Sequence, residues 1–457
     1  MRSGRSRLRN WIEKRSPAQV ITGYYFLAMI ISVALFSIPA VHKPGIHVSF
    51  FQTIFTAVSV ASDTGLAVLN VAETYSVFGY FVIMLVLQFG GIGIMAMSTF
   101  FWLLLDRRIG LTQRRLIMAD NNQFEMSGLV TMMREILVIT LLTELIGGLI
   151  FGIRFLAYYD RWQDAFLQGL FASVSATTNA GMDITGQSLI PYANDYFVQL
   201  LTVALIIFGA IGFPVLIEVK AFLTHLRKRS KEIFRFSLFT KITTVTYGFL
   251  LVLGTILMLL FESDHFLKDM PLMERFFYAF FQTATTRSAG LTTMDINHLS
   301  VPSLLLMSFY MFIGGSPNSV GGGIRTTTFA LNMLFIYQFS RGYRSIKLFR
   351  REVHQEDILK ALAIFLLATV LCVISVIAIC NVNHDLPLIS IILEVCSAFG
   401  TVGLSLGVTP DLGVFSQCIL MVLMFLGRIG LTTCFFFLRG KQDDAKYRYP
   451  VERIMTG

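Results

Sequence analysis

Charged residues are scarce in this sequence: they make up 14% of its 457 residues, whereas 55% are hydrophobic. Average soluble domains carry roughly 25% charged residues. A soluble chain with so little charge could not cover its surface with polar groups, because it has too many apolar residues to bury. The scarcity of charge therefore predicts an integral membrane protein that sits in a lipid bilayer.

Features typical of enzymes and multidomain proteins are also missing. No Pro- or Ser-rich linker and no long polar segment interrupts the chain, so we expect one membrane domain over 1–457 with short cytoplasmic terminal segments. The seven histidines lie mainly in loops or at span ends and form no His-Glu-x-x-His pattern. No catalytic set emerges, and an enzyme is not expected. The cysteines fall in apolar stretches without metal-ligand spacing and are interpreted as inert thiols: Cys372, Cys380, Cys396, Cys418 and Cys434.

The net charge of +9 does not indicate a nucleic-acid partner, because the basic residues lie between apolar runs. They concentrate before the first run and in alternate loops, at 107–115, 220–235 and 341–351. The positive-inside rule places these loops in the cytoplasm, and an even number of spans puts both termini on the same side. The loops set the topology and contact anionic lipid; whether they also dock a partner is open. A cleaved signal peptide is an alternative for the first run, but its length favours an uncleaved span.

Four apolar runs of the chain are too short to cross a bilayer, which takes about 20 residues. Each of them ends at a break rich in Ser or Thr and centred on a glycine, and the four glycines are 116, 109 and 113 residues apart. The short runs are 49–61, 164–177, 272–285 and 386–398. Longer apolar runs precede them at 18–38, 131–156, 241–261 and 358–380, and follow them at 75–103, 195–223, 302–338 and 414–438.

This arrangement predicts an all-α integral membrane protein built from four diverged repeats. Each repeat is a span, a half-helix with a pore loop, and a second span, which makes eight full spans and four half-spans around one central pore. The repeats cover about 18–105, 130–225, 240–340 and 357–440.

The four turns have the chemistry of a cation path. Irregular backbone at membrane depth is tolerated only where it is buried in protein or lines a water-filled cavity. The negative C-terminal ends of four half-helices would favour a cation on a common axis. Carbonyls of the extended backbone could replace the hydration shell of the ion, and glycine supplies the dihedral freedom without a blocking side chain. The alternative is that each turn is only a packed re-entrant loop.

The second long run of the third repeat is interrupted by a glycine-rich loop at 314–323. Its residues are Gly314, Gly315, Ser316, Pro317, Asn318, Ser319, Val320, Gly321, Gly322 and Gly323. A helix does not continue through this composition, and the freed backbone groups must find partners or water, so the loop should border the pore. A phosphate-cradling loop before Arg325 and Thr326 is the rival interpretation. It lacks the Gly-Lys-Ser/Thr ending and the flanking strand.

Glycines also cluster inside two spans, at 90–93 and 209–212. For these clusters we favour close helix–helix approach through small residues.

Several of these motifs resemble one family. The chain is similar to the membrane subunit of bacterial Ktr potassium uptake systems, which are relatives of Trk and plant HKT transporters, and the resemblance runs through essentially the whole sequence. The motifs that carry it are Ser-Ala-Phe-Gly-Thr-Val-Gly-Leu at 397–404, Gly-Arg-Ile-Gly at 427–430 and Arg-Tyr-Pro at 448–450.

The resemblance implies a potassium filter made mostly of backbone oxygens. By position its residues are Ser62, Asp63, Thr64 and Gly65; Thr178, Asn179, Ala180 and Gly181; Arg287, Ser288, Ala289 and Gly290; and Gly400, Thr401, Val402 and Gly403. It also implies that the 314–323 loop obstructs the cavity below the filter and that Arg428 helps to set the barrier. A structural salt bridge at a helix crossing is the alternative for Arg428.

Two charges in the filter stand out. Asp63 departs from the uncharged residue that the resemblance leads us to expect; it either attracts cations at the mouth or turns aside to accept hydrogen bonds from neighbouring amides. Arg287 is a cation beside a cation path. Such a charge normally faces protein and pairs, so we expect Arg287 to brace its loop from behind.

The resemblance further implies a membrane homodimer with one pore in each protomer. A cytoplasmic ring of nucleotide-binding RCK subunits would control gating, so that the nucleotide sits on the partner and not on this chain. The chain would carry potassium, with sodium dependence as in many members, across the bacterial cell membrane. A sodium or weakly selective monovalent cation transporter is the alternative, because of Asp63.

Overall fold

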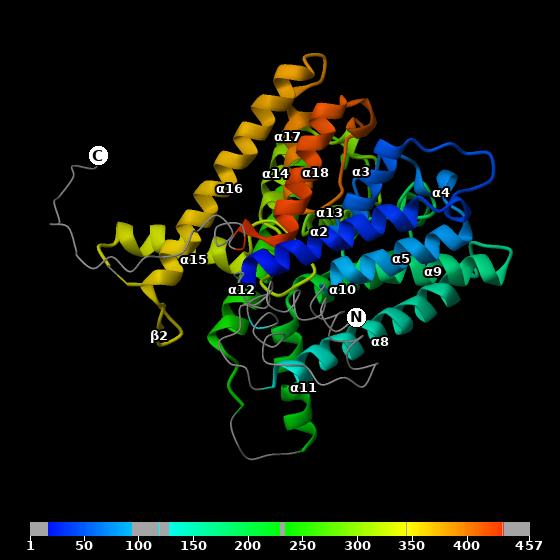
Figure 1. The fold of residues 1–457 in the computed structure, drawn as a ribbon. Helices are drawn as coiled ribbons and strands as arrows, with labels where there is room; N and C mark the ends of the chain where they lie inside the picture. Colours follow the sequence, from blue (N-terminus) through cyan, green and yellow to red (C-terminus); the bar gives the residue numbers. More distant parts are fainter. Residues whose placement is uncertain are drawn as a thin grey trace, which may run out of the picture.

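Helices dominate the computed structural model, which describes residues 17–93, 118, 128–228, 234–343, 345–431 and 433 (Figure 1). The four predicted first spans are helices long and apolar enough to cross a membrane. They are α2 (Pro17–Phe36), α8 (Leu129–Phe155), α12 (Leu238–Glu262) and α16 (Gln355–Val382). Their outward faces carry exposed leucines and isoleucines such as Leu145, Leu149 and Ile153, and a lipid environment accommodates such apolar surface.

The four predicted half-helices are present close to the predicted bounds. They are α3 (Phe50–Ala61), α9 (Trp162–Thr177), α13 (Leu272–Thr285) and α17 (Leu388–Gly400). A capping box starts α3: the Ser49 side chain accepts from the Gln52 amide, and the Gln52 side chain accepts from the Ser49 amide. Proline stands at the N-cap of α13 and of α17. Each short helix ends at one of the glycine-centred breaks.

The helices that follow the breaks are shorter than the predicted second spans. They are α5 (Val77–Gly91), α10 (Tyr196–Ala210), α14 (Val301–Phe312) and α18 (Val414–Ile429). The continuous span predicted over 195–223 is wrong, because α11 (Phe213–Arg227) leaves α10 at an angle of 106°. Gly212, with φ +100°, makes the bend. The third repeat continues into α15 (Thr326–Ser340) after the expected break, and the ends of the spans predicted at 75–103 and 414–438 lie outside the described residues.

Short elements complete the described chain. A two-stranded antiparallel hairpin, β1 (Lys347–Leu348) and β2 (Arg351–Glu352), follows α15. The remaining elements are α4 (Val71–Thr74), η1 (Pro39–Val41), η2 (Ile190–Tyr192), η3 (Ile296–His298) and η4 (Thr409–Asp411). Cys372, Cys380, Cys396 and Cys418 are free thiols, and Cys434 lies outside the described residues.

The helices pack in a cyclic order that repeats from copy to copy. Each short helix lies against the long helix before it: α3 on α2, α9 on α8, α13 on α12 and α17 on α16. Each short helix also lies against the second helix of the preceding copy: α9 on α5, α13 on α10 and α17 on α14. The first short helix, α3, packs against α18 of the last copy, and this contact closes the circle (Figure 1). This packing brings the four breaks to the middle of the molecule.

Candidate functional site

The four glycine turns, 62–65, 178–181, 287–290 and 400–403, meet one another through their backbones. A Cβ on Gly65 would lie under 3.0 Å from the carbonyl oxygen of Ala180, and one on Gly181 under 3.0 Å from that of Ala289. A Cβ on Gly290 would likewise lie under 3.0 Å from the Val402 carbonyl oxygen, and one on Gly403 under 3.0 Å from the Thr64 carbonyl oxygen. Each turn therefore touches the next and the fourth touches the first, so the predicted site residues form a closed ring with no room for a side chain at the glycines.

The four turns also share one backbone conformation. Their glycines have φ values of +84°, +66°, +70° and +95° in chain order. The residue two places earlier is also left-handed in every copy: Asp63, Asn179, Ser288 and Thr401, with φ between +49° and +73°. Non-glycine residues rarely adopt this region, and such strain concentrates at functional sites. The same pair of left-handed residues occurs in all four turns, and this repetition of backbone conformation supports the four-repeat interpretation.

In the ring as the structure describes it, one residue of each turn has an unbonded carbonyl oxygen and an amide that is already hydrogen-bonded. The amides of Thr64, Ala180 and Val402 donate back, at 2.9 Å each, to the carbonyls of Ser59, Ser175 and Ser397 in their own helices, and Ala289 donates to Thr285. Within the described part of the chain, no donor reaches the carbonyl oxygens of the same four turn residues. Free carbonyls beside the negative C-terminal ends of four helices suit a partly dehydrated cation.

The glycines inside the second helices let those helices approach the backs of the turns. A Cβ on Gly90 would lie 2.5 Å from Asp63 Oδ1, and Cβ atoms on Gly209 and Gly427 would clash with the carbonyls of Thr177 and Phe399. Close approach through small residues, the favoured interpretation, is thus present. The sequence interpretation missed that the next glycines, Gly93, Gly212 and Gly430, have positive φ and follow the ends of their helices. The recurring Gly-x-Ile-Gly spacing was the signal.

The 314–323 loop packs directly under the ring. The Ser288 hydroxyl donates to the Thr401 carbonyl at 2.7 Å and accepts from the Gly322 amide at 3.1 Å, so it joins the third turn, the fourth turn and the loop. A Cβ on Gly322 would clash with the Thr401 side chain. Most of the loop is buried, and Arg325, just after it, donates to the Gly321 carbonyl. This internal role leaves the phosphate-loop interpretation without support.

The same loop is anchored to the bend between α10 and α11. The amides of Ser316 and Val320 donate to the carbonyls of Ala210 and Gly209 at 2.9 and 3.1 Å. In return, the Phe213 amide donates to the Asn318 carbonyl at 2.8 Å. The loop of the third repeat and the helix bend of the second are therefore one hydrogen-bonded unit.

Asp63 turns aside from the ring and pairs with Arg428. The Asp63 carboxylate is buried, and Arg428 Nη2 lies 3.2 Å from its Oδ2. The guanidinium also donates to the carbonyls of Gly90, Gly91 and Val320. Of the two roles open for Asp63, turning aside is the one present, although its partner is a guanidinium and not backbone amides. For Arg428, the structural salt bridge is present together with a direct bond to the loop at 314–323.

Arg287 points away from the ring into the protein. Its guanidinium carbon lies 5.4 Å from the ring centroid of Tyr247 on α12 and 5.3 Å from that of Tyr310 on α14. The residue is 1% exposed, and no acceptor in the described part of the chain bonds its three guanidinium nitrogens. Two aromatic faces therefore hold this charge within the protein.

Two acidic residues inside apolar helices were not singled out from the sequence. Glu394 of α17 is 1% exposed and accepts hydrogen bonds from the hydroxyls of Ser405 and Thr409. Glu144 of α8 is 3% exposed and accepts from the Gln88 amide at 2.5 Å. An ionisable residue within an apolar run is itself the signal that would have found both.

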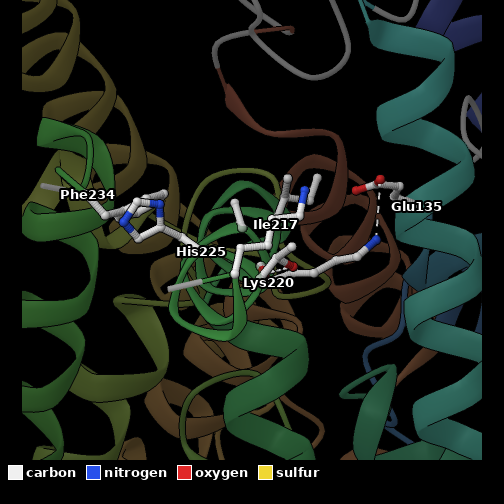
Figure 2. A pocket seen from close by; sticks show the side chains of 8 residues that line it. Glu135, Ile217, Lys220, His225 and Phe234 are labelled. Atoms are coloured by element: carbon white, nitrogen blue, oxygen red, sulfur yellow. Dashed lines mark hydrogen bonds and ion pairs between the residues drawn. The ribbon is translucent and has the colours of Figure 1, made fainter. Parts of the chain in front are cut away.

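A separate hollow of about 400 Å³ lies between α8 and α11, away from the ring. Figure 2 shows Lys220 reaching across it to Glu135, with Nζ and Oε1 3.3 Å apart, and His225 beside Phe234 at the other end. Ile217, Ala221, Thr224 and Lys228 complete the lining. The hollow belongs to the predicted basic surface at 220–235. Among the described residues, no cluster of His, Cys, Asp or Glu is suited to a metal ion.

Comparison with known proteins gives matches over almost the full length. The family model described as TrkH, cation transport protein, matches residues 14–447. The chain is 50% identical over 446 residues to the Ktr system potassium uptake protein D of Bacillus subtilis, and the match covers 98% of both chains. It is 32% identical over 454 residues to the potassium/sodium uptake protein NtpJ of Enterococcus hirae, again with 98% of both covered.

A solved structure shares the fold. The potassium transporter TrkH from Vibrio parahaemolyticus matches with a TM-score of 0.74 and 17% identity, over 93% of this chain and 86% of that one. At this identity the likeness concerns the helical architecture alone.

Proposed function

Because the chain belongs to the TrkH family of cation transport proteins, we propose that it is the potassium-translocating membrane subunit of a bacterial Ktr-type uptake system. One observation carries the proposal: the closed ring of four glycine turns, in which the carbonyl oxygens of Thr64, Ala180, Ala289 and Val402 receive no hydrogen bond from the described residues. The names of the relatives, among them a Ktr system potassium uptake protein, agree with potassium as the cargo. No catalytic role is proposed for any residue.

In the proposed mechanism the ring is the filter. A potassium ion exchanges hydration water for the carbonyl oxygens of Thr64, Ala180, Ala289 and Val402, and the four helix ends add a negative potential. The glycines keep side chains out of the lumen, while the buried amides cannot repel the ion because they are bonded back to their helices. The filter needs no cofactor, and potassium is its ligand.

Below the filter, the loop at 314–323 is the proposed gate. It lies against the third and fourth turns through Ser288 and Gly322, and Arg428 holds its Val320 carbonyl. With the loop in this position a cation leaving the ring meets packed backbone. Conduction therefore requires the loop to move, which breaks the Gly322–Ser288 hydrogen bond and the Arg428–Val320 hydrogen bond.

Shortening the gate loop should raise cation flux. Removing 320–322 takes away Val320 and Gly322, the residues bonded to Arg428 and Ser288, while Gly314 and Gly323 can still close the chain. We expect rubidium flux in proteoliposomes to rise several-fold over the intact protein. A properly folded deletion variant with unchanged flux would contradict the gate.

Arg287→Gln should weaken the filter without unfolding the protein. The substitution removes a charge that two aromatic faces hold, and each such contact contributes roughly 0.5–2 kcal/mol. We expect reduced uptake in Arg287→Gln, and also in a Tyr247→Leu variant, whereas Tyr247→Phe keeps the aromatic face and should retain activity. Intact expression and transport in Arg287→Gln would rule out the bracing role.

The proposal is tested by growth of bacteria that lack their own potassium uptake systems on limiting potassium. The chain is expressed with and without a Ktr regulatory subunit and with and without sodium, and rubidium uptake is measured in parallel. Rescue establishes potassium transport, and its response to sodium tests sodium dependence. No rescue despite normal membrane expression, with sodium flux instead, would favour the alternative of a sodium or mixed-cation transporter, which the name of the Enterococcus relative motivates.

The assembly is proposed on the same basis. We expect a homodimer in the bacterial cell membrane with both termini cytoplasmic, regulated by a ring of nucleotide-binding RCK subunits. By the positive-inside rule, the basic surface around the hollow in Figure 2 lies on the cytoplasmic side, where such a ring would dock. Anionic lipid is the other ligand that this surface suits.

A further inference from the structure

A second buried acid lies behind the first glycine turn, outside the ring and the gate. Glu144 is in the middle of α8 and is 3% exposed. Gln88 Nε2 on α5 lies 2.5 Å from its Oε2, and no other side chain in the described structure bonds the carboxyl. The Glu144 backbone carbonyl accepts from the Ser173 hydroxyl at 2.8 Å, which fixes α8 against α9 at this level.

Among the described residues, no cation pairs with Glu144. Arg428, a buried cation, is already bound to Asp63 and to three backbone carbonyls. Glu144 and Asp63 are close enough for their charges to interact. Two carboxylates and one guanidinium would leave a net negative charge out of contact with water, and an unpaired buried charge is among the most costly arrangements in a protein.

The contact between Glu144 and Gln88 lacks one hydrogen-bond donor. Glu144 Oε1 and Gln88 Oε1 are both buried and both lack a donor, although their side chains are joined through the other two atoms. A carboxylate is an acceptor only, whereas a protonated carboxyl has one O–H to donate. A proton on Glu144 Oε1 would supply the absent donor to the Gln88 oxygen and complete a two-bond acid–amide pair.

We propose that Glu144 is a proton-binding site: it is protonated in the resting protein, and with Gln88 it forms a neutral acid–amide pair behind the first glycine turn. The pair is coupled to the ion path through α5. Gln88 is two residues before Gly90, whose carbonyl accepts from Arg428 and whose Cα packs on Asp63. When Glu144 releases its proton, the new negative charge competes with Asp63 for Arg428 and weakens the ion pair that holds the first turn and the gate loop.

Other charged groups on the described helices around α8 do not take this role. On α8 itself, and on α9, α10 and α11, they lie near helix ends or on the basic helix α11: Arg134, Glu135, Arg154, Asp164, Glu218, Lys220, His225 and Arg227. Gln88 is the polar side chain that α5 presents to Glu144, and the described part of α2 has no charged residue.

Infrared spectroscopy of the purified protein tests the proposal directly and does not depend on transport. The wild type at neutral pH should show a C=O stretching band of a protonated carboxyl that is lost in Glu144→Gln and kept in Glu135→Gln, whose carboxylate is partly exposed and paired with Lys220. Gln88→Leu should move the band to higher frequency, because the acid carbonyl loses its donor. A wild-type spectrum without the Glu144 band would overturn the proposal. If Glu144→Gln does not fold, the frequency shift in Gln88→Leu is the test, and an unshifted band would overturn the proposal.

A transport measurement tests the coupling and rests on the proposed function. Glutamine mimics the neutral acid, since it offers one donor and one acceptor to Gln88, so Glu144→Gln should keep its uptake at neutral pH within about twofold, a difference well under 1.4 kcal/mol. As pH rises, wild-type uptake should increase, because the loss of the Glu144 proton weakens the hold of Arg428 on the gate loop, while Glu144→Gln keeps its rate. Identical pH profiles would overturn the coupling. If neither protein transports rubidium, the proposed function fails, whereas the infrared result still stands.

Discussion

Gly290→Ala is expected to abolish most rubidium uptake while leaving the protein in the membrane. The new methyl group would overlap the Val402 carbonyl of the neighbouring turn, so the backbone of the ring has to shift. Gly290 also has φ +70°, where a Cβ costs roughly 1–2 kcal/mol. Because the ring is closed, a displacement of the fourth turn also disturbs its contact with the first. We expect uptake to fall by roughly tenfold or more, which corresponds to about 1.4 kcal/mol.

Gly407→Ala separates backbone strain from the clash. Gly407 has φ +83°, but a Cβ there would meet no atom within 4 Å. The two variants therefore carry similar dihedral strain, and only Gly290→Ala places an atom in the ring. Near-normal uptake in Gly407→Ala with loss in Gly290→Ala would tie the defect to the ring. Full uptake in a well-expressed Gly290→Ala variant would refute the ring as the ion path.

The sequence predicted the periodic features of the fold well. Apolar run length set the bounds of α9 and α13 to within two residues, because a half-helix can bury its apolar face only over the run itself. The four turns could be located because glycine-centred stretches rich in Ser or Thr recur at the ends of these helices. Family resemblance, and not periodicity, supplied the assignment of individual residues to a filter and a gate.

What the sequence could not predict were contacts made across repeats. The bend at Gly212 depends on the loop at 314–323. The Ser316 and Val320 amides of this loop donate hydrogen bonds to the Ala210 and Gly209 carbonyls, more than 100 residues away in the sequence. Likewise, apolar composition gave no sign that Tyr247 and Tyr310 flank Arg287. Such pairings depend on how the helices close into a circle, and this information is spread over all four copies.

Removing one partner of the Asp63–Arg428 pair should have the largest effect on stability. Arg428→Gln leaves the Asp63 carboxylate buried without its cation, and breaking one side of a buried ion pair costs about 3–5 kcal/mol. Lys360→Gln is the matched control, because Lys360 pairs with Glu356 and Asp357 at the surface at 3.9 Å, where such pairs contribute about 0–1 kcal/mol. Thermal unfolding of the purified protein should show a large decrease in stability for the first variant and little change for the second.

Combining Arg428→Gln with Asp63→Asn distinguishes charge burial from loop anchoring. The double variant has no buried charge at this position, so its unfolding temperature should rise above that of Arg428→Gln alone. The Val320 carbonyl still lacks its guanidinium, however, although the gate loop keeps its bonds to Ser288, to Arg325 and to the α10–α11 bend. Rubidium flux in the double variant should therefore exceed that of the wild type even though stability is partly restored. If the changes in unfolding free energy of the two single substitutions simply added up in the double variant, Asp63 and Arg428 would not act as a pair. The proposed link between the first glycine turn and the gate loop would then be refuted.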